Sequence, residues 1–156
     1  MEVILMFEKR IKKYIELINE KNVSWIKASE LRCPEDKYND EFYEEIKRME
    51  RYGILKVRSF TNTHDSKVLL TSKGAFLGKN FIGNYDNIFE DVVSLITSES
   101  SSLSNDVEIS KRLDVPRIFV DAVFVDLENQ NLIKIKTAIG GMYISKFTDR
   151  GKDCLF

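Results

Sequence analysis

The sequence has very little cysteine, histidine or proline, and this scarcity excludes several classes of protein. Two cysteines, Cys33 and Cys154, and one histidine, His64, occur among 156 residues. Neither cysteine lies in a CxxC pair, so we expect no disulfide scaffold and a reducing, cytosolic compartment. One histidine and two scattered cysteines do not make a zinc site unless several carboxylates join them. We therefore expect no metal centre.

The short motifs of nucleotide-binding and hydrolytic enzymes are also missing. The chain contains neither GxGxxG nor GxxxxGK[ST], the glycine-rich loops that hold phosphate groups. His64 and Asp65 accompany no nucleophile motif such as GxSxG, and we interpret them as part of an exposed polar loop. The sequence therefore predicts a protein that is not an enzyme and uses no cofactor.

Long apolar runs and a large net charge are absent as well. The apolar residues 1–7 are too few to span a membrane, and the charged residues that follow at once do not suit a signal peptide. The chain has 24 Lys plus Arg and 25 Asp plus Glu, so its positive and negative charges nearly balance. It is therefore not a polycation held to DNA by bulk charge. We expect a cytoplasmic protein of one medium domain or two small ones, without membrane contact.

What the chain does contain is an internal repeat. Residues 51–74 and 129–151 each read as a helix end, a strand, a loop, a second strand and the pattern Thr-x-basic-Gly. Thr71 and Thr148 are 77 positions apart, and so are Gly74 and Gly151. We therefore expect two copies of one unit, residues 1–80 and 81–156, which join at a glycine-containing turn.

Helices are expected before the strands of the first copy. Apolar residues recur at helical spacing across residues 11–18, which predicts a first helix. Residues 25–32 suit a short second helix. A third helix is expected over residues 40–52, with Asn39 as its N-cap and Tyr43 on its buried face.

The second copy repeats this order. Apolar residues predict a first helix over residues 88–96, and Asn105 is placed to cap a second helix. Pro116 suits the first residue of a third helix. Strands are expected at residues 132–136 and 142–147.

Helix, helix, tight turn, helix and a two-stranded hairpin is the element order of the winged helix-turn-helix superfamily, which the chain resembles twice. The resemblance implies an α+β fold of two tandem winged-helix units, each with three helices and a two-stranded wing. Members of this superfamily are transcription regulators, replication initiators or proteins that use the scaffold to bind other proteins. Tandem units on a short chain also resemble the bacterial segregation and condensation protein B and the ESCRT-II subunits, which chiefly bind proteins. The residues that carry the resemblance most sharply are Ile109-Ser110-Lys111-Arg112-Leu113-Asp114-Val115-Pro116, then Val120, Leu127 and Asn131-Leu132-Ile133.

Acidic residues argue against base reading by the third helices. In helix-turn-helix geometry this helix enters the major groove, where surrounding phosphates make an acidic first turn costly. The first copy has four acids in those turns, and the second has two acids on the face that we expect to be exposed. These acids are Asp40, Glu41, Glu44, Glu45, Asp121 and Asp126.

Cations lie instead on the wings. Residues 1–80 hold 16 basic and 13 acidic residues (+3), and residues 81–156 hold 8 and 12 (−4), which favours the first copy for nucleic-acid contact. Wing cations can contact phosphates or reach a minor groove, although charged hairpin edges also guard against strand association without any ligand. The residues expected to contact double-stranded DNA are Lys37, Tyr38, Asn39, Lys56, Arg58, Lys67, Arg117 and Lys136.

Two helices carry more apolar residues than one inward face needs. Val3, Leu5 and Met6 fall outside the apolar stripe of the first helix, and the helix around Phe124 is apolar on several sides. These residues would meet the other copy, a second chain in a homodimer, or a protein partner. We expect a non-enzymatic DNA-binding transcription regulator. The alternative is an adaptor whose winged-helix units bind proteins without contacting nucleic acid.

Overall fold

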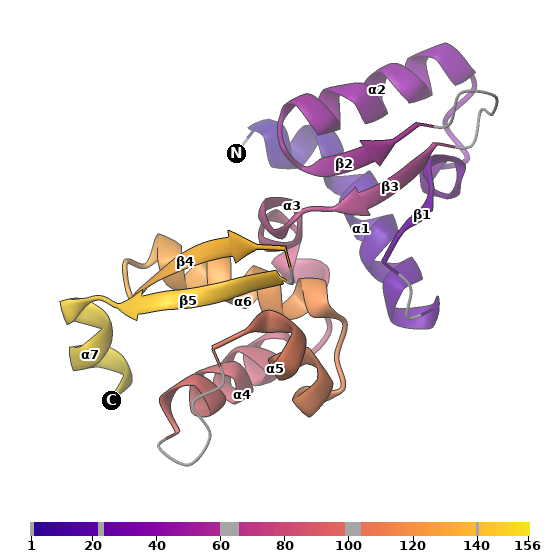
Figure 1. Ribbon diagram of the computed structural model, residues 1–156. Helices are drawn as coiled ribbons and strands as arrows, with labels where there is room; N and C mark the ends of the chain where they lie inside the picture. Colours follow the sequence, from indigo (N-terminus) through magenta and orange to yellow (C-terminus); the bar gives the residue numbers. More distant parts are fainter. Residues whose placement is uncertain (1, 22–23, 60–65, 99–103, 140) are drawn as a thin grey trace. The chain divides into compact units, whose positions relative to one another are not determined.

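The computed structural model describes residues 2–21, 24–59, 66–98, 104–139 and 141–156, with the backbone alone for residues 2–6 and 20–21. The chain divides into two compact units, Met1–Phe81 (unit 1) and Ile82–Phe156 (unit 2). Each unit combines helices with one small antiparallel sheet, so the α+β class is confirmed (Figure 1). None of the described helices is long and apolar enough to cross a membrane.

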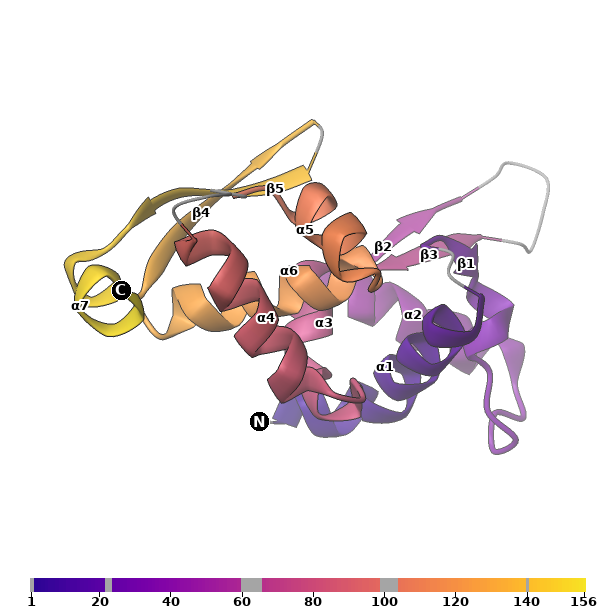
Figure 2. The same ribbon diagram turned by 90° about the horizontal axis from the view of Figure 1, so that it is seen from below.

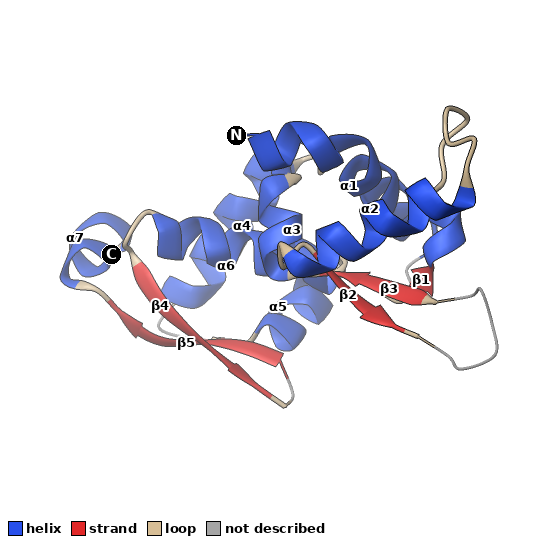
Figure 3. Cartoon of the chain, turned by 90° about the horizontal axis from the view of Figure 1, so that it is seen from above, coloured by secondary structure: helices blue, strands red, loops and turns tan. Residues whose placement is uncertain are grey.

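Unit 1 contains the elements α1 (Glu2–Lys21), β1 (Ile26–Lys27), η1 (Ala28–Leu31), α2 (Asn39–Arg51), β2 (Leu55–Arg58), β3 (Lys67–Leu70), α3 (Ser72–Leu77) and η2 (Lys79–Phe81). The strands form an antiparallel sheet in the order β1–β3–β2, so β3 lies in the centre (Figure 3). Apolar side chains of α1, α2 and one face of this sheet form the core. They include Phe7, Ile11, Tyr14, Ile15, Phe42, Ile46, Met49, Ile26, Leu55, Val68 and Leu70.

The prediction of a helix over residues 25–32 is wrong. Ile26 and Lys27 form the short strand β1, and only the 3-10 helix η1 follows. The ladder extends one bond further, because the N–H of Ala28 donates to the carbonyl of Ser66 over 2.7 Å. A two-residue strand exists only through a partner that is distant in sequence, so local spacing does not reveal it.

Helix α2 starts one residue earlier than expected. Tyr38 takes the N-cap position, and the Oδ1 of Asn39, the expected cap, instead accepts a hydrogen bond from Arg32. Phe42, rather than Tyr43, completes the buried face of the helix. The helix ends before Gly53, whose φ of +74° lies in the left-handed region that glycine adopts readily.

Unit 2 contains α4 (Tyr85–Thr97), α5 (Asp106–Leu113), α6 (Arg117–Asn129), β4 (Ile133–Ala138), β5 (Gly141–Phe147) and α7 (Asp149–Leu155) (Figure 2). Asn105 caps α5 as expected, since its Oδ1 accepts from the N–H groups of Val107 and Glu108 over 2.8 and 3.3 Å. Asn105 also forms an isolated bridge with Tyr143 of β5. Asn105 thus precedes α5 and pairs with the second strand of the hairpin, just as β1 pairs with β3 in unit 1.

Most of α6 is buried, which overturns the exposed face expected for its two acids. Asp121 and Asp126 are only 8% and 7% exposed. Asp126 accepts hydrogen bonds from the hydroxyl of Tyr85 over 2.6 Å and from Nε2 of Gln130 over 3.0 Å. A buried carboxyl group needs such partners, because leaving it unpaired would be costly.

The same hydrogen-bonded junction occurs in both units at the end of the hairpin. Thr71 caps α3, where its Oγ1 accepts from the N–H of Gly74 over 3.0 Å, and its hydroxyl lies 2.6 Å from the carbonyl of Gly53. Thr148 caps α7 in the same way, with 2.9 Å to the N–H of Gly151 and 2.6 Å to the carbonyl of Asn131. The threonine therefore ties the closing helix to the turn before the first hairpin strand.

Glycine is required in this junction because a carbonyl packs against it. A Cβ on Gly74 would lie 2.5 Å from the carbonyl oxygen of Ile54, and one on Gly151 would lie 1.9 Å from that of Leu132. Gly53 and Asn131, which precede those carbonyls, both have positive φ. The repeat found in the sequence is thus a repeat of one detailed local structure.

Candidate nucleic-acid interface

One face of the sheet in unit 1 carries four cations. Alternate strand residues point to opposite sides, and the inward positions of β1, β2 and β3 are apolar. The exposed outward positions hold Lys27 on β1, Lys67 on β3, and Lys56 and Arg58 on β2. We call these four residues the cationic face.

The register places three of these cations in one row. Lys67 is the cross-strand partner of Lys27 on one side and of Arg58 on the other. Like charges that face each other directly across two strands are destabilising. Charged edge residues protect a sheet from association, but Lys67 lies on the central strand, where no such protection is needed. An anion lying over this row would offset the repulsion between Lys67 and its two cross-strand neighbours.

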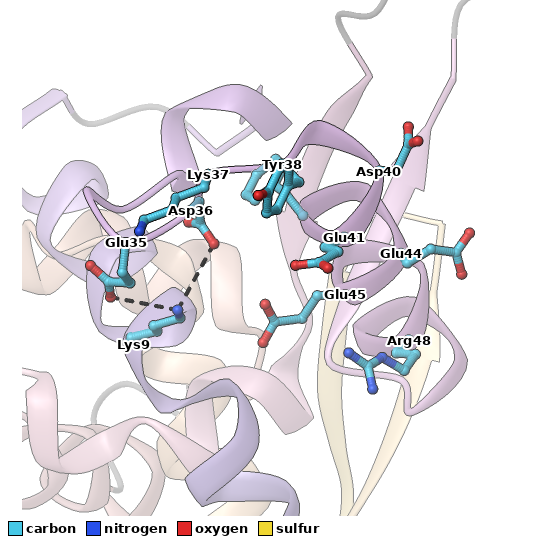
Figure 4. Close-up of a pocket in the computed structure, with 11 residues that line it drawn as sticks. Lys9, Glu35, Asp36, Lys37, Tyr38, Asp40, Glu41, Glu44, Glu45 and Arg48 are labelled. Atoms are coloured by element: carbon cyan, nitrogen blue, oxygen red, sulfur yellow. Dashed lines mark ion pairs between the residues drawn. The ribbon is translucent and has the colours of Figure 1, made fainter.

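Lys37, Tyr38 and Asn39 lie in a different environment. Lys37 and Tyr38 line an open pocket of about 620 Å³ between α1, the segment before α2 and the first half of α2 (Figure 4). Lys9 lies 3.5 Å from Glu35 at this pocket. Its other lining residues are Asp36, Asp40, Glu41, Phe42, Glu44, Glu45 and Arg48. Carboxylates outnumber cations here, so the pocket does not suit a phosphate.

A buried arginine beneath this region holds α1, the loop and α2 together. Arg10 is 1% exposed, and its Nη2 donates to Oδ1 of Asp36 and to Oε2 of Glu45, each over 2.6 Å. Its Nη1 donates to the carbonyl of Leu31 over 3.0 Å. The hydrogen bonds from Arg10 hold the pKa of Asp36 well below its ordinary value. Glu45 is therefore paired and does not add a free negative charge to α2.

This ion-pair cluster was not predicted, although the sequence contains one signal for it. Arg10 lies three residues after Phe7 and four before Tyr14, on the apolar stripe of α1. A charged residue on a buried stripe needs partners of opposite charge. The partners themselves, Asp36 and Glu45, could be identified only from the folded structure.

In unit 2, Arg117 is exposed but already paired. Its Nε donates to Oδ2 of Asp106 over 2.8 Å, while Oδ1 of Asp106 accepts from the N–H of Met142 over 3.0 Å. Asp106 is fully buried. The pKa of Asp121 lies well above its ordinary value, mainly because Asp121 is itself buried and also because it shares a hydrogen bond with Asp106. Arg117 thus balances a buried carboxyl pair that ties α5, α6 and β5 together.

The hairpin of unit 2 also exposes cations. Lys136 lies opposite Tyr143, and Lys134 lies directly opposite Lys146. Strand β4 is an edge, and β5 is paired on its other side only around Tyr143 and Ile144, so protection against strand association explains these lysines without a ligand. The cationic face of unit 1 is therefore the stronger candidate.

Of the residues expected at a partner interface, Phe124 alone has a described side chain. Phe124 is 0% exposed and belongs to the core, so it is not available to a second chain. The side chains of Val3, Leu5 and Met6 lie outside the described part of the molecule, and so does the loop with His64 and Asp65. Within the described residues, no group of three or more His, Cys, Asp or Glu residues is arranged to hold a metal ion.

Comparison of the sequence with models of known families and with curated proteins found no match.

Proposed function

We propose that this chain is a DNA-binding regulator with two winged-helix units, and that the cationic face of unit 1 contacts the phosphates of duplex DNA. The order helix, strand, 3-10 helix, helix, hairpin and the sheet order β1–β3–β2 support a winged-helix fold for unit 1. The observation that carries the functional proposal is the position of Lys67. It lies on the central strand between Lys27 and Arg58, an arrangement that a bound polyanion would make favourable.

The spacing of the cationic face suits several phosphates. Neighbouring strands lie about 4.8 Å apart, so the row from Lys27 to Arg58 spans about 10 Å, and Lys56 lies about 7 Å from Arg58 along β2. Three or four phosphate contacts would give a log–log dependence of affinity on salt with a slope of about −3 to −4. Because phosphate contacts carry no sequence information, we expect weak sequence preference.

Helices α2 and α6 take the place of the groove-reading helix in the two units, and both favour a binding mode that does not depend on groove insertion. Asp40, Glu41 and Glu44 are exposed in the first half of α2, where phosphates would be repelled. In unit 2, α6 is buried over most of its length, and Arg117 at its start is paired with Asp106. The sheet face therefore offers the favourable contacts.

A matched pair of double variants tests this proposal. Fluorescence anisotropy of a labelled duplex at about 50 mM salt, a condition in which phosphate contacts are strong, would measure affinity. We expect the variant Arg58→Glu/Lys67→Glu to bind at least about tenfold more weakly, with a shallower salt slope. The control Lys47→Glu/Arg48→Glu makes the same charge change on α2 and should retain most of the affinity. Equal losses in both variants would contradict a sheet-face mode.

The acidic pocket favours a second candidate function, an adaptor that binds a protein. Its excess of carboxylates and the 65% exposed Tyr38 would suit a basic segment of a partner. A wild-type chain that fails to bind duplex DNA at about 50 mM salt would favour this function. Binding of a lysine- and arginine-rich peptide, weakened by Glu41→Lys/Glu44→Lys, would then support it.

A further inference from the structure

The only tryptophan of the chain lies under one residue of the cationic face. Trp25 is half-buried and immediately precedes β1. The guanidinium carbon of Arg58 lies 4.5 Å from the centroid of the Trp25 ring. The residue that precedes one edge strand is thus brought together with an outward-facing residue of the other edge strand.

This contact distinguishes Arg58 from Lys56, the other cation on β2. A guanidinium over an indole ring is attracted to it, and the contact limits the rotamers of a long exposed side chain before any ligand arrives. Lys56 instead lies opposite the aliphatic Leu69. Arginine also presents a planar array of donors that matches a phosphate better than the point charge of lysine does.

We infer that Trp25 is a positioning residue that pre-orders Arg58 as the main phosphate contact of the cationic face. This inference rests on the proposed function, because it assumes that the face binds a nucleic-acid backbone. The ring does not contact the phosphate. It acts through Arg58, which it holds in the row with Lys67 and Lys27.

A double-mutant cycle separates positioning from a general structural role. Duplex affinity would be measured for W25L, R58A and W25L/R58A, with thermal unfolding as a control for folding. We expect W25L to bind about two- to fivefold more weakly, which is the value of an exposed cation–π contact expressed as a ratio of affinities. In the R58A background, W25L should cause no further loss. An equal loss from W25L in both backgrounds would overturn the inference.

Two single variants complete the cycle. W25F keeps an aromatic ring under Arg58 and should recover most of the affinity lost in W25L. K56A removes the same charge from the same strand as R58A, and we expect it to cost less affinity. If K56A costs as much as R58A, or if W25F binds no better than W25L, Arg58 is not pre-ordered by the ring.

Tryptophan fluorescence gives an independent readout, since Trp25 is the only source of that signal. Titration of wild-type protein with unlabelled duplex should change the emission and saturate at the affinity found by anisotropy. Binding seen by anisotropy without any change in emission would overturn the inference and leave the proposed function intact. No binding in either experiment would instead overturn the proposed function.

Discussion

Replacing Lys67 by threonine should make unit 1 more stable while it weakens DNA binding. Lys67 faces Lys27 and Arg58 directly, so the substitution removes two like-charge pairs. If each like-charge pair costs as much as a favourable cross-strand pair contributes, about 0.2–1 kcal/mol, the free energy of unfolding should rise by about 0.4–2 kcal/mol. Threonine is also well suited to a central strand, so the new side chain adds no penalty of its own.

The matched control is Lys56→Thr, the same change on the same sheet face. Lys56 lies opposite Leu69 rather than a cation, so its removal should leave the unfolding free energy almost unchanged. Urea unfolding followed by Trp25 emission reports on unit 1, because this unit holds the only tryptophan. The gain in K67T should shrink between low and high salt, since salt screens charges on an exposed face. A K67T protein that is less stable than wild type at low salt would refute the reasoning.

Three further predictions concern the buried charges and the repeated junction. Arg10→Met removes the arginine that pairs with the part-buried carboxylates of Asp36 and Glu45, while Asp36 keeps the N–H of Cys33 and an ion pair with Lys9 at 3.9 Å. The change should lower the unfolding free energy of unit 1 by about 3 kcal/mol, and a change below about 1 kcal/mol in urea unfolding would contradict the role given to this ion pair. Folding lowers the pKa of Asp36, so unit 1 should lose stability as pH falls below about 4. Folding raises the pKa of Asp121, so unit 2 should lose stability as pH rises above about 4. Each group should change the unfolding free energy by up to about 1.4 kcal/mol per pH unit. Unfolding followed by NMR separately for each unit, at pH values below and above about 4, should show these opposite trends. Asp121→Asn should reduce the loss of stability of unit 2 as pH rises. Gly151→Ala should destabilise unit 2 by about 1–3 kcal/mol in thermal unfolding, because its Cβ would meet a carbonyl, whereas Gly83→Ala, with nothing within 4 Å of its Cβ, should be neutral.

Local signals allowed much of the fold to be predicted. The junction built on Thr71 and Gly74 recurs at Thr148 and Gly151 because both copies need the same cap and the same close approach of a carbonyl. Such requirements are met by residues three positions apart, so they are visible in the sequence. The same holds for Asn105, whose cap of α5 depends only on the residues that follow it.

Features that depend on distant partners could not be found in this way. Strand β1 exists because it pairs with β3, and the hydrogen-bond partner of the buried Asp121 is Asp106 on another helix. Because α6 is apolar on nearly every side, its sequence gives no polar face on which to place an acid. The prediction that Asp121 and Asp126 lie on an exposed face was therefore wrong.

The value of Lys67 as a candidate also depended on the structure. The sequence identified it as a wing cation, and a charged edge strand explained it equally well. Only the order β1–β3–β2 shows that Lys67 is central and that cations flank it on both sides. Sheet order follows from tertiary pairing, which periodicity within one strand does not encode.

Chemical-shift mapping of the isotopically labelled chain with a short duplex tests the central claim most directly. Backbone amides of β1, β2 and β3 near Lys27, Lys56, Arg58 and Lys67 should shift on titration, and the shifts should diminish as salt is added. Shifts that cluster in the acidic first half of α2, or no shifts anywhere in unit 1, would contradict the proposed use of the cationic face.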